Sequence, residues 1–270
     1  MTDPTPTDLP TPERVSDALG PDAVPEPSPK PQSASVGGDR WAHRRAEPRG
    51  LAFLWTCYLL AATAISIGQL GRMGLTTYEV YRPAARVLLT FVLMGVAVLW
   101  PMVRLSQEAP GRPMRSFLAD AVVMLAPGAA IIFSQSFPGM AGWSLHVVAT
   151  VAGFALAWGL VVCGLLGMAM TSSLPRWCWM IAVVGVALAG PAASVVGGVG
   201  ESEDGVNPFL VMSPLTVSFE VTRDRLWSGA TAQVTPAHLT GLFAVTFMGA
   251  VVFVTGAIRS SRVVKGTPPA

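Results

Sequence analysis

The sequence predicts an all-α membrane protein, a bundle of about six transmembrane helices with both ends of the chain in the cytoplasm. Three observations predict it. The 270 residues are 51% apolar and only 13% charged, whereas soluble domains carry about 25% charged residues. No Asp, Glu, Lys or Arg occurs between Asp120 and Arg176. Several apolar runs reach about 20 residues, which at ~1.5 Å per residue cover a hydrocarbon core of ~30 Å.

The chain begins with a segment that is unlike the rest. Residues 1–38 contain nine prolines and almost no large apolar residues. Such a segment buries too little surface to offset its ordering entropy, so we expect a disordered, Pro-rich cytoplasmic tail. Residues 39–50 then place four arginines beside Trp41. This basic juxtamembrane segment either lies on an anionic leaflet or simply sets the topology.

A membrane domain, 51–258, follows the basic segment. Pro83, Pro175 and Pro236 are expected in the first turns of their helices, where the missing N–H costs no intrahelical bond. Thr235 is the expected N-cap of the last helix. A cytoplasmic tail, 259–270, ends the chain. The predicted spans cover residues 51–71, 83–103, 117–137, 143–170, 175–199 and 236–258.

Basic residues predict the orientation. With the N-terminus inside, eleven Arg and Lys side chains fall on the cytoplasmic side and four on the outer side. Arg86 lies just inside the outer end of the second span. This bias follows the positive-inside rule. We therefore expect a multi-pass protein of the cytoplasmic (inner) membrane, with the lipid bilayer as its first partner.

The outer loop 200–235 is the longest connection between spans. Leu215, Phe219 and Thr222 would share a helical face, although Leu215, Val217 and Phe219 also alternate as in a strand. An isolated strand would lack a hydrogen-bonded partner. We therefore expect one or two short helices at the outer interface, with Ser213 as an N-cap and Pro214 in the first turn.

The chain lacks the short motifs of nucleotide, metal and hydrolytic sites. It contains no GxxxxGK[ST], HExxH or GxSxG pattern and no Cys/His metal spacing. We therefore expect no enzyme, with no catalytic, cofactor-binding or metal residues, and no nucleic-acid partner. His146 and His238 lie near the outer ends of their spans. A metal or haem site is one interpretation of this pair, and interfacial polar caps are the favoured one.

Charge is nearly absent from the span interiors. Only Asp120 and Arg86 come within a few residues of them, and each is placed where it can reach the interface. Ion-driven transporters usually keep ionisable relays at mid-membrane. The pattern therefore argues against a secondary transporter and against a charge-lined channel.

Two helix breaks fall in the middle of predicted spans. Pro127 and Gly128 interrupt the third span, and Gly190 and Pro191 interrupt the fifth. A proline inside a helix removes one backbone bond and usually kinks it. Such breaks either mark a translocation path, as in transporters, or only shape helix packing.

The segment before the last span resembles, in its layout, a known family of membrane proteins. Asn207-Pro208 precedes Ser213-Pro214 and a short apolar run, and a final span begins near His238. In this order and layout the chain resembles the ABC-2-type exporter permeases, which often have short outer helices in this place. The resemblance implies a membrane subunit that works as a homo- or heterodimer with a separate ATP-binding subunit.

The same resemblance implies an ATPase-coupling element in the cytoplasmic loop between the second and third spans. Its candidate residues are Glu108, Arg112 and Arg115. Family members usually have an acidic, Arg-containing element here, whereas Glu108 is the only acid of this short loop.

Two hypotheses stay open from the sequence. The first is the permease of an exporter for a lipid, polysaccharide or small amphiphile. The second is a non-transport scaffold or assembly component that acts through helix contacts and its Pro-rich tail. The near absence of intramembrane polar residues and the composition of the loop both favour the second.

Overall fold

The computed structural model describes residues 48–68, 77–110, 113–197, 205–224 and 231–266, and all of them belong to one compact unit, 43–270. Every regular element within these ranges is a helix. Six helical stretches are long and apolar enough to cross a membrane. The prediction of an all-α, six-span membrane bundle is confirmed. The tail 1–38, and the basic segment up to residue 47, lie outside the described residues.

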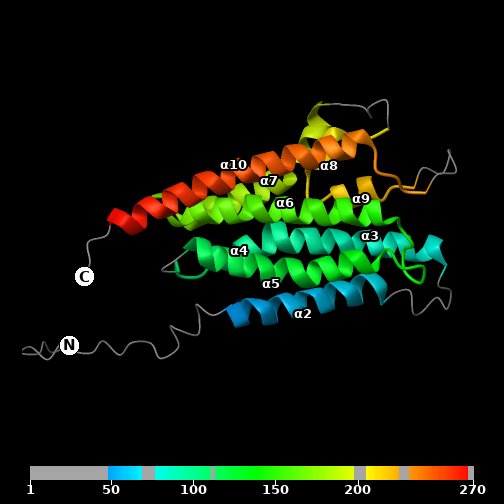
Figure 1. Cartoon of the computed structure of the whole chain (residues 1–270), viewed down its shortest axis with the longest axis horizontal. Helices are drawn as coiled ribbons and strands as arrows, with labels where there is room; N and C mark the ends of the chain where they lie inside the picture. Colours follow the sequence, from blue (N-terminus) through cyan, green and yellow to red (C-terminus); the bar gives the residue numbers. More distant parts are fainter. Residues whose placement is uncertain (1–47, 69–76, 111–112, 198–204, 225–230, 267–270) are drawn as a thin grey trace, which may run out of the picture. The chain divides into compact units, whose positions relative to one another are not determined.

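Two of the elements between the spans are short helices, and one span is built from three pieces (Figure 1). The second span, Val80–Leu105, joins α3, the π-helical turn η2 and α4 without a break. Helix α2 begins and α10 ends at the same end of the bundle, as an even number of crossings requires. The elements are α2 (Pro48–Ile67), α3 (Tyr78–Met94), η2 (Gly95–Leu99), α4 (Trp100–Leu105), α5 (Pro113–Ser134), α6 (Leu145–Met170), α7 (Arg176–Gly197), α8 (Pro208–Met212), α9 (Val217–Val221) and α10 (Pro236–Gly266).

The helix of the second span begins before the proline that was expected in its first turn. Helix α3 begins at Tyr78, and Pro83 lies inside it. The Thr77 carbonyl accepts hydrogen bonds from the backbone N–H groups of Val80, at 3.1 Å, and Tyr81, at 3.0 Å. The first turn is therefore already closed when the chain reaches Pro83. That proline only removes the N–H that would bond to Glu79.

The last span begins where it was expected, at Pro236, but its cap differs from the simple one predicted. The Thr235 N–H donates to Nδ1 of His238 at 3.0 Å, and the Thr235 hydroxyl lies 3.1 Å from the same nitrogen. His238 thus reaches back to the N-cap residue from the third helical position, as Glu or Gln does in a capping box. Helix α10 also continues to Gly266, beyond the expected end at 258.

Helix α6 forms the centre of the bundle and is the most buried of the six spans. Helices α5 and α10 pack along it. The closest approach is at Gly164 of α6 and Gly256 of α10, where a Cβ added to Gly256 would lie 2.5 Å from the Gly164 carbonyl oxygen. In lipid, helices are held by close packing of this kind, which small residues permit.

Helix α2 packs on the second span through two aromatic side chains. The rings of Trp55 and Tyr58 are stacked with centroids 5.3 Å apart, and a Cβ at Gly95 would overlap the Trp55 ring. The Trp55 indole donates to the Met124 carbonyl at 3.0 Å, and the Tyr58 hydroxyl donates to the Phe91 carbonyl at 2.8 Å. The π turn begins at Gly95, so α2 is anchored where the second span is irregular.

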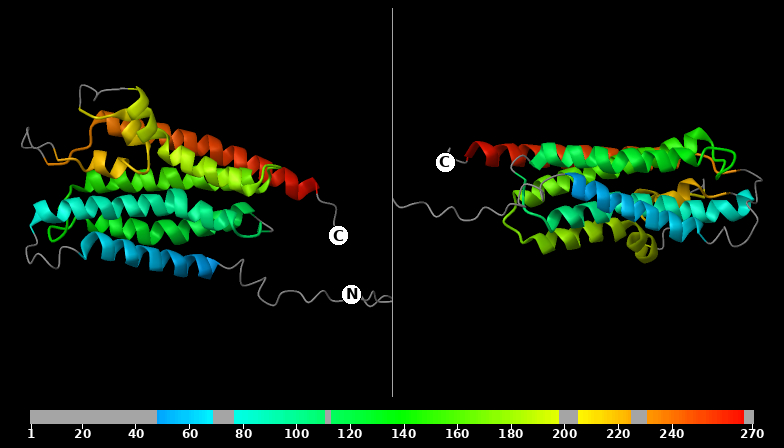
Figure 2. Two further views of the ribbon diagram at one scale, coloured as in Figure 1. Left: turned by 180° about the vertical axis from the view of Figure 1, so that it is seen from behind. Right: turned by 90° about the horizontal axis from the view of Figure 1, so that it is seen from below.

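The two short helices that were expected at the outer interface lie among the spans. Figures 1 and 2 show α8 and α9 beside the spans, within their length, rather than beyond their ends. Helix α8 packs on α7 and α10, while α9 packs on α3 and α6. Asn207 caps α8 by accepting a hydrogen bond from the Phe209 N–H at 3.0 Å. Ser213 and Pro214 form the turn between the two helices instead of starting one.

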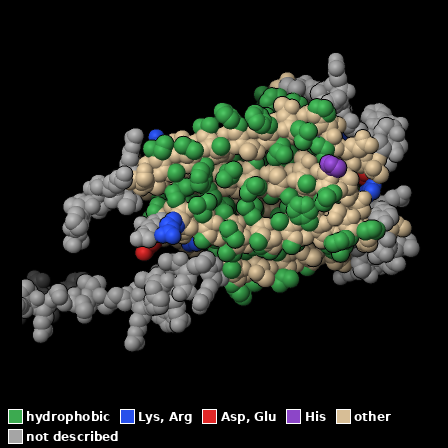
Figure 3. All heavy atoms as spheres, viewed as in Figure 1, with side chains coloured by type: hydrophobic (Ala, Val, Ile, Leu, Met, Phe, Trp, Pro, Cys, Tyr) green, Lys and Arg blue, Asp and Glu red, His purple; other side chains and the backbone are tan. Residues whose placement is uncertain are grey.

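The flanks of the bundle carry the surface expected in lipid. Large apolar side chains are exposed along α2, α7 and α10. On the face in Figure 3, hydrophobic side chains cover the flank, and the coloured Lys, Arg, Asp and Glu side chains lie towards the two ends. The described part of the chain is thus apolar outside as well as inside.

Replacing Gly256 by Val should destabilise the bundle by roughly 1–3 kcal/mol, because the added methyls meet the backbone of α6. Thermal unfolding of the detergent-solubilised protein measures the change. Gly185→Val is the matched control, since nothing lies within 4 Å of a Cβ at Gly185. Equal losses in the two variants would show that the α6–α10 contact is not special.

Candidate functional site

A buried ion pair joins the second and third spans at the predicted cytoplasmic end. Arg104 of α4 donates from Nε and Nη2 to the two carboxylate oxygens of Asp120 of α5, and both hydrogen bonds measure 2.5 Å. The side chains are 5% and 1% exposed. Asp120 therefore does not reach the interface by itself, as the sequence interpretation had it. A two-pronged Arg–carboxylate pair holds it inside the bundle.

The loop after α4 is tied to the same pair. The third side-chain nitrogen of Arg104, Nη1, donates to Oε1 of Gln107 at 2.7 Å, and Arg176 of α7 donates to the Gln107 carbonyl at 2.5 Å. The loop thereby connects three spans at this end. The candidate coupling residues Glu108 and Arg115 are exposed beside it. The third candidate, Arg112, lies outside the described residues.

Removing one partner of the buried pair should lower the free energy of unfolding more than removing both partners. Asp120→Leu leaves the Arg104 charge buried, so we expect the free energy of unfolding to fall by about 3–5 kcal/mol. The double variant Arg104→Leu with Asp120→Leu should lose clearly less. Chemical or thermal unfolding in one detergent compares the two. Additive losses would contradict an interaction between these side chains.

A second polar cluster joins α3 to the residues after α9 at the opposite end, the predicted outer end. Arg82 and Arg86 bind the two carboxylate oxygens of Asp224 at 3.0 and 2.7 Å. Arg86 also donates to the hydroxyl and the carbonyl of Thr222, at 3.2 and 2.6 Å. From the sequence, Arg86 was expected to reach the interface, and no partner was identified for it. The structure provides that partner because α9 packs along α3.

Two more polar contacts occur deeper, near the middle of the spans. The hydroxyls of Thr90 and Ser218 lie 2.5 Å apart, between α3 and α9. The Ser213 hydroxyl donates to the Ala187 carbonyl of α7 at 2.8 Å. Ala187 lies four residues before Pro191, so its carbonyl is the one that this proline leaves without a helical N–H. The turn between α8 and α9 thus supplies the hydrogen bond that the Ala187 carbonyl cannot form within α7.

The Ser213 contact yields a double-mutant test. Ser213→Ala should destabilise the protein by about 1–2 kcal/mol, because the Ala187 carbonyl loses its donor in an apolar environment. In a Pro191→Ala background the helix supplies an N–H again, so the same substitution should cost much less. Unfolding of the four forms measures the coupling. Identical losses in both backgrounds would contradict the proposed role of Ser213.

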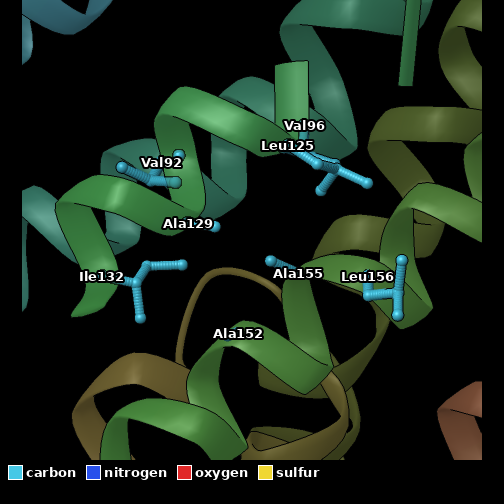
Figure 4. A pocket seen from close by; sticks show the side chains of 9 residues that line it. Val92, Val96, Leu125, Ala129, Ile132, Ala152, Ala155 and Leu156 are labelled. Atoms are coloured by element: carbon cyan, nitrogen blue, oxygen red, sulfur yellow. The ribbon is translucent and has the colours of Figure 1, made fainter. Parts of the chain in front are cut away.

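The helix break at Pro127 and Gly128 lies at an apolar hollow of about 200 Å³, the α5–α6 groove. Figure 4 shows side chains from the second, third and fourth spans around it. Gly128 keeps it open, since a Cβ there would lie 3.1 Å from Cγ1 of Val92. Its lining is Val92, Val96, Leu125, Gly128, Ala129, Ile132, Ala152, Ala155 and Leu156.

The second break, at Gly190 and Pro191, lies at a larger apolar hollow of about 330 Å³, the α7–α10 groove. A Cβ at Gly190 would lie 2.7 Å from Cβ of Ser213, so α7 can approach α8 only through a glycine. Helices α5 and α7 run through Pro127 and Pro191 without interruption, and the neighbouring glycines, Gly128 and Gly190, line the grooves. The lining of this groove is Trp158, Val186, Ala189, Gly190, Ala193, Phe209, Met212, Ala244, Val245 and Met248.

The two histidines of the outer end occupy different surroundings. His146 is exposed and lines an open hollow of about 600 Å³. His238 is buried in the cap of α10. Within the residues that the structure describes, no three His, Cys, Asp or Glu side chains are grouped as metal ligands would be. The described residues offer anchoring contacts and two apolar grooves.

Comparison of the chain with protein-family models, with curated proteins and with solved structures finds no match.

Proposed function

We propose that this integral membrane protein is the permease subunit of an exporter that draws its energy from a separate ATP-binding subunit. The observation that carries the proposal is the pair α8 and α9, which re-enters the bundle between the fifth and sixth spans. Short outer helices at this point are what the resemblance to ABC-2-type permeases implies. A lipid or another small amphiphile is the proposed cargo.

The second span supports this proposal because polar contacts tie each of its two ends to a neighbouring segment. Its cytoplasmic end carries Arg104, which is tied to the loop at Gln107. Its outer end carries Arg82 and Arg86, which are tied to Asp224 after α9. A force applied to the loop would therefore move the second span and, through Asp224, the re-entrant pair. The π turn between the two ends is an irregular helix of the kind that can act as a hinge.

The charged side chains within the spans are paired with one another or with nearby groups, and this pairing supports an external energy source. Arg86, Arg104 and Asp120 each hold a fixed partner in the structure. An ion-coupled transporter needs ionisable groups that can exchange protons or ions during the cycle. Charges committed to structural pairs suit a bundle that is moved from outside by a second subunit.

A scaffold that works without transport remains a second candidate. The observation in its favour is that the two grooves are apolar and that their linings cover only the middle and outer parts of the spans. A scaffold would recruit partners through its helix flanks and the tail 1–38. Deletion of that tail should then abolish its function, whereas a permease should keep its activity without it.

The decisive experiment is purification of the tagged full chain under gentle solubilisation, followed by mass spectrometry and an ATPase assay in proteoliposomes. We expect an ATP-binding subunit to co-purify. Glu108→Arg should weaken that association roughly two- to fivefold, because an exposed charged contact is worth little more. Ser173→Arg, on the neighbouring loop of the same side, is the matched control. Isolation of the chain without any ATP-binding subunit would overturn the proposal.

A further inference from the structure

We propose that the α7–α10 groove is a binding site for a largely apolar molecule that dissolves in the bilayer and carries one oxygen acceptor, such as an ester, ether or ketone. This inference rests on the proposed export function for its purpose and deepens it by placing the cargo. The groove lies between two spans, under the turn of the re-entrant pair, at the break of α7.

The groove is reached from the side, through the hydrocarbon. Its rim residues Val186, Phe209, Met212 and Met248 are between 36% and 39% exposed. These side chains belong to α7, α8 and α10, so the opening faces the lipid between α7 and α10. An occupant must therefore come from the bilayer, and an apolar rim of this kind excludes charged molecules.

The lining of the groove includes one tryptophan whose indole N–H is unpaired within the described residues. Trp158 of α6 lines the groove and is 3% exposed. Its indole Nε1 is buried and finds no acceptor among the described residues. The indole N–H groups of Trp100, Trp143 and Trp179 also find no acceptor among the described residues, and Trp158 is the one of the four that lines either groove. Buried donors in native structures usually have a partner, so an unpaired one beside a groove calls for an explanation. A ligand oxygen within the groove would provide the missing acceptor, which is why the proposed occupant is not a pure hydrocarbon.

The depth of the groove separates this occupant from ordinary phospholipid. Trp158 lies at the middle of its span, Leu145–Met170, and Met248 at the middle of Pro236–Ser261. Phospholipid headgroups and their linkages lie at the interface, outside the ~30 Å hydrocarbon core. An acceptor beside Trp158 must therefore belong to a molecule whose oxygen can enter the core. A small amphiphile without a charged headgroup meets this condition.

The side chains that line the groove suit a site that binds several apolar molecules of different shape. Met212 and Met248 are flexible and polarizable, and such side chains adapt to ligands of different shape. On the opposite wall Ala189, Gly190 and Ala193 leave space because their side chains are small. The volume of about 330 Å³ lies within the range of small-molecule pockets, about 300–1,000 Å³.

Photolabelling of the purified full chain, in phosphatidylcholine nanodiscs and without any ATP-binding subunit, tests the proposal. The probes are a diazirine-tagged fatty acid methyl ester and a diazirine-tagged alkane of the same length. Mass spectrometry quantifies adducts on Met212 and Met248. We expect the ester to label both saturably and to be displaced by untagged ester, and the alkane to label without saturation.

Three variants assign the site. Trp158→Phe should weaken saturable ester labelling about three- to tenfold, the effect of one lost hydrogen bond, and should leave alkane labelling unchanged. Ala189→Phe fills the groove and should abolish saturable labelling. Ala192→Phe, an exposed alanine of the same helix that does not line the groove, is the matched control and should behave as the wild type.

Equal, non-saturable labelling by ester and alkane in the wild type would mean that only bilayer lipid fills the groove, and would overturn the proposal. Loss of ester labelling in Ala192→Phe, or its full retention in Trp158→Phe, would also overturn it. Size-exclusion profiles and melting curves identify any variant that fails to fold. Because no ATP-binding subunit is present, a negative result here leaves the export proposal standing, and failed co-purification leaves a positive result here intact.

Discussion

The structure depends on one constraint, that polar groups within the hydrocarbon must find partners inside the protein, since lipid offers none. Pro191 has no N–H to donate to the Ala187 carbonyl, and the Ser213 hydroxyl donates to that carbonyl instead. Asp120 is a buried carboxylate of the third span, and Arg104 of the second span pairs with its charge. In each case the two groups belong to different helices or turns, 26 residues apart for Ser213 and Ala187 and 16 for Arg104 and Asp120. The constraint therefore sets tertiary contacts as well as local structure.

The second span gains its central role from the same constraint. Its arginines lie at both ends, and each needs a carboxylate within reach. Arg104 finds Asp120 beside the loop after α4, and Arg82 and Arg86 find Asp224 beside the re-entrant pair. These contacts tie one end of the second span to the loop after α4 and the other end to the residues after α9. This is the physical basis for relating an event at the loop to the outer half of the bundle.

The grooves show how much of a candidate site can be predicted from sequence. Pro127, Gly128, Gly190 and Pro191 stand out from residue type and position, and the two glycines line apolar hollows although both helices continue through their prolines. The other walls could not be predicted. Trp158 has the appearance of an ordinary buried aromatic residue in an apolar run, and its unpaired N–H becomes visible only when its neighbours are known. Likewise, no pattern in the sequence connects Asp224 with Arg86, because the contact depends on how deeply α9 enters the bundle.

The sequence by itself determined the all-α class, the six spans and the existence of short helices between the last two. These features follow from local quantities: the length of apolar runs, the spacing of charges and the chemistry of proline and N-cap residues. Only the tertiary structure decided that the short helices re-enter the bundle, that α6 lies at its centre, and which charges pair. Those outcomes depend on which helix faces meet. In a chain whose spans are apolar on every side, residue patterning does not specify that choice, because close packing at residues such as Gly164 and Gly256 selects it.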